Sequence, residues 1–397
     1  MEELKFYEDL IGLSDLKITS IEKSPKKFIF HGHYTKSHAK CPVCLKTTQK
    51  INQTDRRKFR DLKISAHEVW LYIKVPQFYC PHCNRYFFKN PPWVASGKSY
   101  TKRQSKWIFE MCKKQAFTQV AQLVDMSAKT VERIFYEETE RRLDLPARYA
   151  NVRKIGIDEI AHRKGKKDYV CVLTDLERGI QLDVLPNRKK ETLVAHFQSL
   201  GKEFCEQIEV VSCDIWKTYI YVAEEYFPNC EVVIDRFHVV KALNNVLDSL
   251  RKKLRKEHPE KDCFKHLKWK LFKRSEKCSA DDNRLLQTAF KASWLLQEVY
   301  QLRKSFNAMF DIAQNKKQLS KSLYCWIQHG KQLNFNPLNK FIKTLKNWKN
   351  QIAAFANENI SNAVTEGLNN SLRFFKRLSF GLPNFENMRL RVLAASI

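Results

Sequence analysis

Glycine, long apolar runs and a basic leader are what this sequence lacks. With 10 glycines in 397 residues, it has no glycine-rich loop that could cradle phosphates and no collagen-like repeat. No apolar run approaches the roughly 18 residues that a membrane-spanning helix requires. The N-terminal Met1-Glu-Glu-Leu-Lys5 is acidic where a secretory signal peptide is basic and then apolar. We therefore expect a cytoplasmic protein that has no membrane partner.

Positive charge, in contrast, is plentiful. The chain carries 71 Lys and Arg against 43 Asp and Glu, which gives a net charge of +28. This excess is larger than solubility requires. A polyanionic partner explains it most simply, and nucleic acid fits better than an anionic membrane because the chain has no anchor. The length is sufficient for two or three domains.

Four of the twelve cysteines form two C-x-x-C pairs, Cys41-Pro-Val-Cys44 and Cys80-Pro-His-Cys83. In a cytoplasmic chain such cysteines are metal ligands or free thiols rather than disulfides. Each pair can place two thiolates on one tetrahedral Zn²⁺, and four soft ligands suit zinc. Unpaired buried cysteines, a redox C-x-x-C motif, or His82 as a replacement ligand are the alternatives. The sequence predicts one structural zinc ion held by the four cysteines.

The N-terminal region around these pairs, residues 1–95, shows the pattern of short strands and turns. Glu68–Val75 is an example of such a strand, and Asn90-Pro-Pro-Trp93 ends the region because two prolines stop regular structure. Several basic residues lie between the two cysteine pairs: Arg56, Arg57, Lys58, Arg60 and Lys63.

Residues 96–150 have the pattern of a helix-turn-helix. Two short amphipathic segments are joined by Asp125-Met126, and Ser127 can cap the second helix. The second helix of such a module enters the major groove of DNA. Its predicted DNA-facing residues are Lys129, Thr130 and Arg133. A plain three-helix packing module would show the same pattern, and Leu145-Pro146-Ala147 is the expected linker that follows.

From residue 151 onward, strands alternate with helices. We expect strands at residues 152–158, 168–175, 180–185, 208–214 and 231–235, with helices near 191–204 and 216–226. Short connections make the first three strands an antiparallel meander. The order βββαβαβα is that of the ribonuclease-H-like fold, in which the first and fourth strands are parallel neighbours.

Two acids end the first and fourth of these strands. Asp158 and Asp214 would therefore be adjacent at the carboxyl edge of the sheet, where open α/β sheets bind ligands. Either acid alone could simply form a turn after its strand.

A third acid, Glu366, lies in the helical stretch 362–377 near the end of the chain. Asn369 or Asn370, and Arg373, follow it at spacings of three, four and seven, so they share one helix face. A carboxylate, an amide and a guanidinium in one column can hold a metal and a phosphate side by side. The alternative is a solvated amphipathic helix with an ordinary ion pair.

Between the fifth strand and this helix, residues 239 to about 350 are predicted to be almost entirely helical. The segment Arg251–Arg274 combines many Lys and Arg with Phe264, Trp269 and Phe272, a mixture that suits a nucleic-acid track with stacking positions. A solvated helix face with a normal core stripe is the alternative. We expect a helical insertion in the catalytic fold.

Five motifs together resemble the ISL-three family of bacterial insertion-sequence transposases over nearly the whole chain. The motifs, in addition to the cysteine pairs and the helix-turn-helix, are Ile157-Asp-Glu159, Ser212–Lys217, Asp235–Lys241, Asn362–Asn370 and Phe380–Arg391. The resemblance implies a multidomain α+β protein with a zinc ribbon (1–95), a helix-turn-helix (96–150) and a ribonuclease-H-like α/β domain (151–397) that contains the helical insertion.

The resemblance also implies the chemistry. Asp158, Asp214 and Glu366 would be the catalytic Asp-Asp-Glu acids and would bind two Mg²⁺ or Mn²⁺ ions, whereas Asp235 and His238 match an accompanying D-x-x-H motif. Two such ions can activate a nucleophile and stabilise the leaving oxygen at a DNA phosphodiester. Asn369 or Asn370 would orient Glu366 or a water, and Arg373 would contact phosphate.

The implied function is transposition. The protein would bind the terminal inverted repeats of an insertion sequence, cleave a strand, and transfer it to target DNA, as a homodimer on double-stranded DNA in the bacterial nucleoid. Two other functions are compatible with the same residues: a zinc-dependent DNA-binding regulator with an inactive catalytic domain, and a ribonuclease-H-type nuclease without strand transfer.

Overall fold

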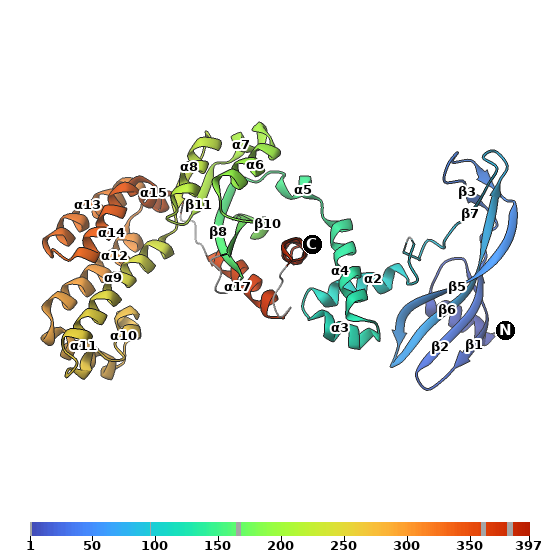
Figure 1. Ribbon diagram of the computed structural model, residues 1–397, viewed down its shortest axis with the longest axis horizontal. Helices are drawn as coiled ribbons and strands as arrows, with labels where there is room; N and C mark the ends of the chain where they lie inside the picture. Colours follow the sequence, from blue (N-terminus) through green and yellow to red (C-terminus); the bar gives the residue numbers. More distant parts are fainter. Residues whose placement is uncertain (1, 96, 164–167, 359–362, 379–383) are drawn as a thin grey trace. The chain divides into compact units, whose positions relative to one another are not determined.

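The computed structural model describes residues 2–95, 97–163, 168–358, 363–378 and 384–397 (Figure 1). These residues divide into two units. The first unit contains residues up to Leu143 together with Phe375–Ala395 and Ile397, and the second contains Asp144–Phe374 with Ser396. In the ranges that the structure describes, no helix is both long enough and apolar enough to cross a bilayer.

The first unit begins with a helix and a five-stranded sheet. Its elements are α1 (Glu2–Ile11), β1 (Leu16–Lys23), β2 (Lys27–Tyr34), β5 (Ile51–Ile64), β6 (His67–Cys80) and β7 (Arg85–Phe88). The strands are paired in the order β1-β2-β6-β5, and β7 pairs with β6. Alternate residues of β6 are buried, including Val69, Leu71 and Ile73, which packs one face of the sheet into a core.

The prediction of short strands in this region is wrong for two of them. β5 and β6 have 14 residues each and form one long antiparallel hairpin. The hairpin turns at Ser65, whose φ is 53°. Two further strands, β3 (Ala39–Lys40) and β4 (Thr47–Thr48), form a small ribbon around the first cysteine pair.

The helix-turn-helix pattern corresponds to three helices of the first unit, α2 (Lys102–Cys112), α3 (Phe117–Val124) and α4 (Ala128–Arg142). Ser127 caps α4 by accepting a hydrogen bond from the Thr130 N–H, as predicted. Asp125 adopts a left-handed conformation (φ 49°) at the turn. Arg60 of β5, one of the basic residues between the two cysteine pairs, donates to the carbonyl oxygens of Val124 and Asp125 and thereby fixes the turn.

A further helix of the same unit, α18 (Phe385–Ala394), packs against α4. Its Arg391 is buried, donates to the carbonyl oxygens of Cys112 and Gln115, and lies over the ring of Phe117 at 4.3 Å. This packing joins residues that are more than 250 positions apart. Local sequence patterns give no sign of it.

The second unit begins with α5 (Leu145–Tyr149). The expected linker Leu145-Pro146-Ala147 forms the first turn of this helix and directly follows the boundary between the two units at Leu143 and Asp144. Asp144 accepts a hydrogen bond from the Ala147 N–H and caps the helix. Proline is tolerated in a first turn because the N–H that it lacks would have no partner there.

The second unit is built on a mixed five-stranded sheet with the order β10-β9-β8-β11-β12. The strands are β8 (Lys154–Arg163), β9 (Asp168–Asp175), β10 (Ile180–Leu185), β11 (Val210–Cys213) and β12 (Glu231–Ile234). β8, β9 and β10 form the predicted antiparallel meander. β11 is parallel to both β8 and β12, so the predicted parallel pairing of the first and fourth strands is confirmed.

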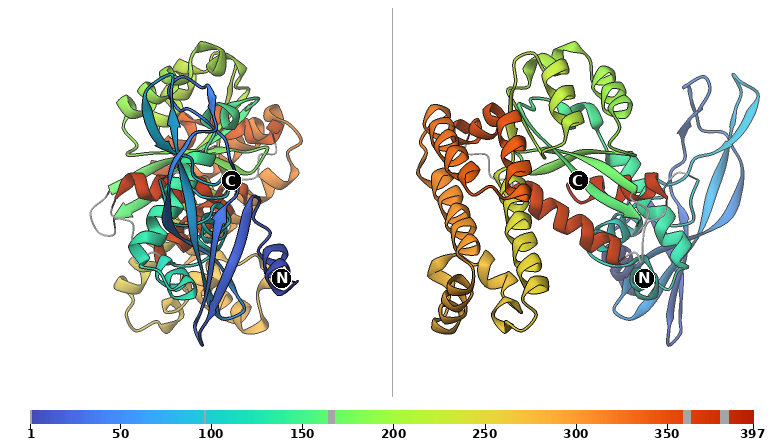
Figure 2. Two further views of the ribbon diagram at one scale, coloured as in Figure 1. Left: turned by 90° about the vertical axis from the view of Figure 1, so that its right-hand side faces the viewer. Right: turned by 60° about the vertical axis from the view of Figure 1, so that its left-hand side comes forward.

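Three helices cover one face of this sheet and α17 covers the other (Figures 1 and 2). The covering helices are α6 (Lys190–Leu200), α7 (Lys202–Gln207) and α8 (Lys217–Tyr226). A single helix was expected for α6 and α7, but Gly201, with φ 88°, separates them. α17 comprises Ala363–Leu378.

The segment after β12 is almost entirely helical. It contains α9 (Arg236–Glu257), η1 (Asp262–Phe264), α10 (Lys268–Phe272), η2 (Ser275–Lys277), α11 (Ala280–Ala292), α12 (Trp294–Ile312), α13 (Lys316–Gln332), α14 (Asn336–Asn347), α15 (Lys349–Ala353) and α16 (Phe355–Glu358). These helices lie together in the right-hand view of Figure 2, and their buried side chains continue the core of the sheet.

Candidate functional site

Two groups of metal-ligating side chains are found in the described part of the chain. The cysteine cluster contains Cys41, Cys44, Cys80 and Cys83, and the acid cluster contains Asp158, Asp214 and His238. Within each cluster the ligand atoms lie within 4.8 Å of one another. The first cluster belongs to the first unit and the second to the second unit.

The cysteine cluster is formed by two tight turns. The Leu45 N–H donates to the Cys41 carbonyl oxygen at 3.0 Å, and β6 ends at Cys80. The Sγ atoms of Cys41 and Cys83 are 4.0 Å apart, and those of Cys44 and Cys80 are 3.6 Å apart. Four sulfur ligands from two such turns fit one tetrahedral structural Zn²⁺.

The surroundings of two of these thiols shift their pKa values in opposite directions. The N–H groups of Cys44 and Val43 lower the pKa of Cys41 to about 7. A hydrogen bond to Cys44 and burial raise the pKa of Cys83 to about 12. Four thiolates this close repel one another unless a cation lies among them, as a structural zinc would. His82, the alternative ligand, is exposed and lies outside the cluster.

The acid cluster lies where the parallel part of the second sheet ends. The last parallel pair is Ile157 with Cys213, and Asp158 and Asp214 directly follow these residues. Asp214 comes after the last residue of β11, as predicted. Asp158 does not end its strand, because β8 continues to Arg163 through its antiparallel pairing with β9.

A histidine completes this cluster. His238 Nε2 lies 2.8 Å from Asp214 Oδ1 and 3.6 Å from Asp235 Oδ2. Asp235 is buried and caps α9, since its Oδ1 accepts from the Phe237 N–H at 3.0 Å. The cap orients the first turn of α9 and thereby the imidazole. Both D-x-x-H residues therefore contact or support the acid cluster.

Burial is the largest influence on the pKa values of Asp158 and Asp214. It raises the pKa of Asp158 and that of Asp214 above the usual carboxyl value. Burial alone would lower the pKa of His238, but its hydrogen bond to Asp214 and the charges of Asp235 and Asp158 outweigh burial and raise that pKa. Carboxylate oxygens are the hard donors that Mg²⁺ and Mn²⁺ prefer, so the two acids fit a divalent cation.

Helix α17 meets the acid cluster through Asn369. The Asn369 Nδ2 donates to Asp158 Oδ2, and the side chain is 2% exposed. Its Oδ1 is buried and accepts no hydrogen bond from the residues that the structure describes. The neighbouring Asn370 is exposed and accepts from Arg373 Nη1 at 2.8 Å. The structure thus separates two asparagines that the sequence left as alternatives.

The third predicted acid, Glu366, has its backbone in α17, one turn before Asn369. Its side chain lies outside the described residues, as do Asn362 and 380–383 of the motifs. Arg373 is exposed on the same helix.

The predicted DNA-facing residues lie on α4 in the first unit. Lys129 and Arg133 are exposed, and Arg133 Nη1 lies 3.9 Å from Glu137. The Thr130 hydroxyl is 2.8 Å from that of Ser127, so it also supports the N-terminal cap. Two cations therefore remain on the outer side of this helix.

The basic segment 251–274, predicted as a track for nucleic acid, is only partly exposed. Arg251 is buried and bonded to Asp248 and to the Phe264 carbonyl oxygen. Phe264 itself belongs to the core, whereas Trp269 is 71% exposed. Part of the segment therefore stabilises the insertion, and only part of it can form a track for nucleic acid.

Sequence reasoning missed a cluster that adjoins the acids. Arg188 Nη1 lies 2.6 Å from Glu159 Oε2, and its guanidinium lies over Tyr169 at 4.7 Å and over Trp216 at 4.2 Å. Glu159 follows Asp158, and Trp216 is two residues after Asp214. The position of Trp216 two residues after Asp214 was the sign in the sequence that an aromatic residue adjoins the acids.

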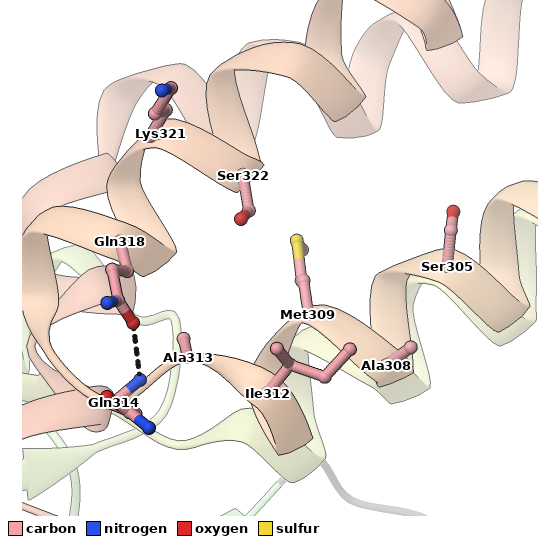
Figure 3. A pocket seen from close by; sticks show the side chains of 9 residues that line it. All are labelled: Ser305, Ala308, Met309, Ile312, Ala313, Gln314, Gln318, Lys321 and Ser322. Carbon is pink, nitrogen blue, oxygen red and sulfur yellow. Dashed lines mark hydrogen bonds between the residues drawn. The ribbon is translucent and has the colours of Figure 1, made fainter.

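A cavity of about 590 Å³ lies between α12 and α13 of the insertion (Figure 3). Met309 and Ile312 contribute apolar walls, and Gln318 Oε1 accepts from the Gln314 N–H at 2.9 Å. Lys321 is the one charged residue among those that line it. This lining holds no group of acids or thiols for chemistry.

Comparison with known families covers most of the chain. Residues 155–392 match the ISL3-type DDE family described as a transposase. Residues 37–83 match the zinc finger of transposases IS204/IS1001/IS1096/IS1165, and residues 90–138 match the helix-turn-helix domain of transposase family ISL3. The predicted zinc ribbon and helix-turn-helix are thereby confirmed.

Curated relatives carry the same description. The transposase for insertion sequence element IS1001 of Bordetella parapertussis is 24% identical over 373 residues, which cover 91% of this chain and 90% of the relative. The transposase for insertion sequence element IS1557 of Mycobacterium tuberculosis, in strains CDC 1551/Oshkosh and H37Rv, is 24% identical over 370 residues, covering 85% of this chain and 82% of the relative.

Proposed function

Because this chain belongs to the ISL3 family of transposases, as its motifs predicted, we propose that it cleaves and joins DNA with Asp158, Asp214 and Glu366 as metal-binding acids. One observation carries this proposal: Asp158, Asp214 and His238 converge within 4.8 Å, and Asn369 attaches α17 to Asp158. Glu366 lies on that helix at a spacing of three from Asn369, which gives the two residues neighbouring positions on one side.

We further propose that the second unit is a ribonuclease-H-like domain. The support is its strand order, β10-β9-β8-β11-β12, with antiparallel β8 to β10 and parallel β8, β11 and β12. In this proposal residues 151–397 are the catalytic region and residues about 239–350 its helical insertion, while α18 at the end of this region packs against α4 in the first unit. Residues 1–95 and 96–150 are the zinc ribbon and the helix-turn-helix.

The residues of the acid cluster and those beside it have distinct tasks. Asp158, Asp214 and Glu366 would hold a divalent cation, which would supply Lewis-acid stabilisation to the phosphodiester. Asn369 holds the Asp158 carboxylate in one orientation. Asp235 fixes the start of α9, and His238 donates to Asp214 or shares its proton. Arg373, exposed on α17, offers a guanidinium to a DNA phosphate.

The protein would bind DNA mainly through contacts to the phosphates. Lys129, Thr130 and Arg133 of α4 are the proposed major-groove contacts, and affinity should fall steeply with salt because bound counterions are released. Two element ends must meet for coupled cleavage and joining, so we propose a homodimer on double-stranded DNA. Because its substrate would be chromosomal DNA, we also propose that the protein associates with the bacterial nucleoid.

The decisive experiment uses purified full-length protein and a DNA duplex that carries the inverted repeats flanking its gene. We expect Mg²⁺ or Mn²⁺ to support strand cleavage and joining to a second duplex. The Asp214→Asn protein should bind the ends with unchanged affinity and should not cleave them. Asp262→Asn, at an 81% exposed carboxylate of the insertion, is the matched control and should cleave normally.

Three other outcomes would contradict parts of this proposal. Cleavage by Asp214→Asn at the wild-type rate would remove Asp214 from the catalytic set. Nicked product without joined product would indicate a nuclease that lacks strand transfer. End binding without cleavage by the wild type would indicate a DNA-binding regulator with an inactive domain.

A further inference from the structure

Two exposed aromatic side chains flank the acid cluster. Trp216 follows the end of β11, two residues after Asp214, and is 41% exposed. Phe237 follows the end of β12, directly before His238, and is 50% exposed. Because β11 and β12 are parallel neighbours, both residues lie at the same edge of the sheet as the acids.

Trp216 has one ring face in contact with a fixed cation. Arg188 lies 4.2 Å from the indole centroid and is bonded to Glu159, the residue after Asp158. Tyr169 contacts the same guanidinium at 4.7 Å. The indole is therefore held by a stack that is anchored beside the acids, and it keeps exposed surface although it is held. A preorganised aromatic ring loses little conformational entropy when a ligand stacks on it.

Phe237 is held in a similar way. Its ring packs edge-on against His238, with centroids 5.3 Å apart, and Lys241 Nζ lies 5.9 Å from its centroid. Each exposed ring thus has a cationic neighbour. Aromatic rings interleaved with cations are typical of surfaces that bind unpaired nucleotides, since the rings stack on bases and the cations meet the backbone.

We propose that Trp216 and Phe237 form a stacking site for an unpaired nucleobase of the DNA end, next to the phosphodiester that is cleaved. This inference rests on the proposed function, because it assumes that the acid cluster receives a DNA backbone. Unstacking a base from the duplex costs free energy, and stacking of that base on an exposed aromatic ring would offset this cost. Stacking tolerates any base, so the site would contribute little to sequence specificity.

The first test detects the contact without cleavage. Duplex ends are prepared with 5-iodouracil at successive positions around the junction of element and flanking DNA, and are irradiated with the protein in the absence of divalent cation. We expect one position to crosslink strongly, with Trp216 or Phe237 identified in the crosslinked peptide. Crosslinks that map only to α4 and other parts of the first unit would overturn the proposal.

The second test measures cleavage in Mg²⁺. On a fully paired end, Trp216→Ala should cleave about tenfold to a hundredfold more slowly than wild type, the range that loss of one base stack implies. A mismatch at the crosslinking position should recover part of this loss, because the base is already unpaired. Trp216→Phe should retain most activity, and Phe237→Ala should show a smaller loss of the same kind.

Trp294→Ala provides the matched control, since Trp294 is 67% exposed in the insertion. It should cleave paired and mismatched ends like the wild type. Equal rates for Trp216→Ala and wild type on paired ends would overturn the stacking site. If Trp216→Ala fails to fold in a thermal melt, Trp216→Phe, Phe237→Ala and the crosslink map decide the question.

The two proposals fail in different ways. A wild type that crosslinks through Trp216 and does not cleave would leave the stacking site standing and would refute the catalytic function. A wild type that cleaves and joins, without the crosslink and without sensitivity to Trp216→Ala, would leave the transposase function standing and would refute the stacking site.

Discussion

Asn369 donates its side-chain amide to Asp158 across 211 positions of sequence. The bond joins a helix that follows the whole insertion to the first strand of the second sheet. It also separates Asn369 from Asn370, since the first is buried against the acid and the second is exposed beside Arg373. Two adjacent residues of one type thus have different surroundings, which makes them a matched pair for testing the site.

We predict that Asn369→Ala lowers cleavage by about tenfold to a hundredfold, because a hydrogen bond to a charged group contributes ~1.5–3 kcal/mol. Mn²⁺ affinity of the DNA-free protein, measured by calorimetry, should fall as well, since the Asp158 carboxylate loses its orientation. Asn370→Ala should leave Mn²⁺ affinity unchanged. Equal Mn²⁺ affinities for the two variants would contradict a role for Asn369 at the metal site.

Local pattern was sufficient for much of the second unit. The alternation of strand-like and helical segments located the strands, and their order predicted that β8 and β11 are parallel neighbours, which brings Asp158 and Asp214 together. The position of Asp158 within β8 was not predictable, because the strand is extended by its pairing with β9 and not by its own composition.

Long-range packing was beyond the reach of sequence patterns. α18 follows the catalytic motifs in sequence but packs with α4, and Arg391, read only as part of a family motif, enters that core. Arg60 looked like one basic residue among several, yet it caps the carbonyl end of α3. In each case the partner lies far away in the chain, so neither periodicity nor charge runs could reveal it.

The cysteine cluster should hold about one zinc ion per chain, and Cys41→Ser should lose it. Removal of one thiolate leaves an incomplete tetrahedral site, and metal binding is coupled to folding in such small domains. Metal analysis of purified protein and a thermal melt would measure both effects. Cys325→Ser, at an exposed cysteine outside the cluster, should keep its zinc and its melting temperature. A Cys41→Ser protein with full zinc content would refute the assignment.

Arg391 should be a major determinant of the stability of the first unit. We predict that Arg391→Ala lowers the free energy of unfolding of that unit by about 2–4 kcal/mol, through the loss of packing on Phe117 and of bonds to two carbonyl groups. DNA-end binding should weaken in parallel. Glu386→Ala, at a 64% exposed residue of the same helix, should change stability by less than ~0.5 kcal/mol. Denaturant unfolding would contradict the prediction if both variants behaved alike.

A pH-dependent ion-pair cluster stabilises the insertion. Asp282 is buried and lies 2.5 Å from Lys270 Nζ and 2.6 Å from Lys273 Nζ. Hydrogen bonds from these lysines and from the Ser279 N–H lower the pKa of Asp282 well below its usual range. A lowered folded-state pKa favours the folded state at any pH above the unfolded value of ~3.9, and this contribution is lost as pH falls toward the folded value.

Asp282→Asn should therefore lower the melting temperature at pH 7, and its difference from wild type should shrink as the pH is lowered below about 4. Asp281→Asn is the matched control, because Asp281 is 88% exposed and its nearest cation, Arg284 Nη1, is 3.6 Å away. This control should melt like the wild type at both pH values, since an exposed pair contributes little. If the melting temperature of Asp282→Asn stayed equally far below that of the wild type at low pH, packing and not the carboxylate charge would stabilise this part of the insertion.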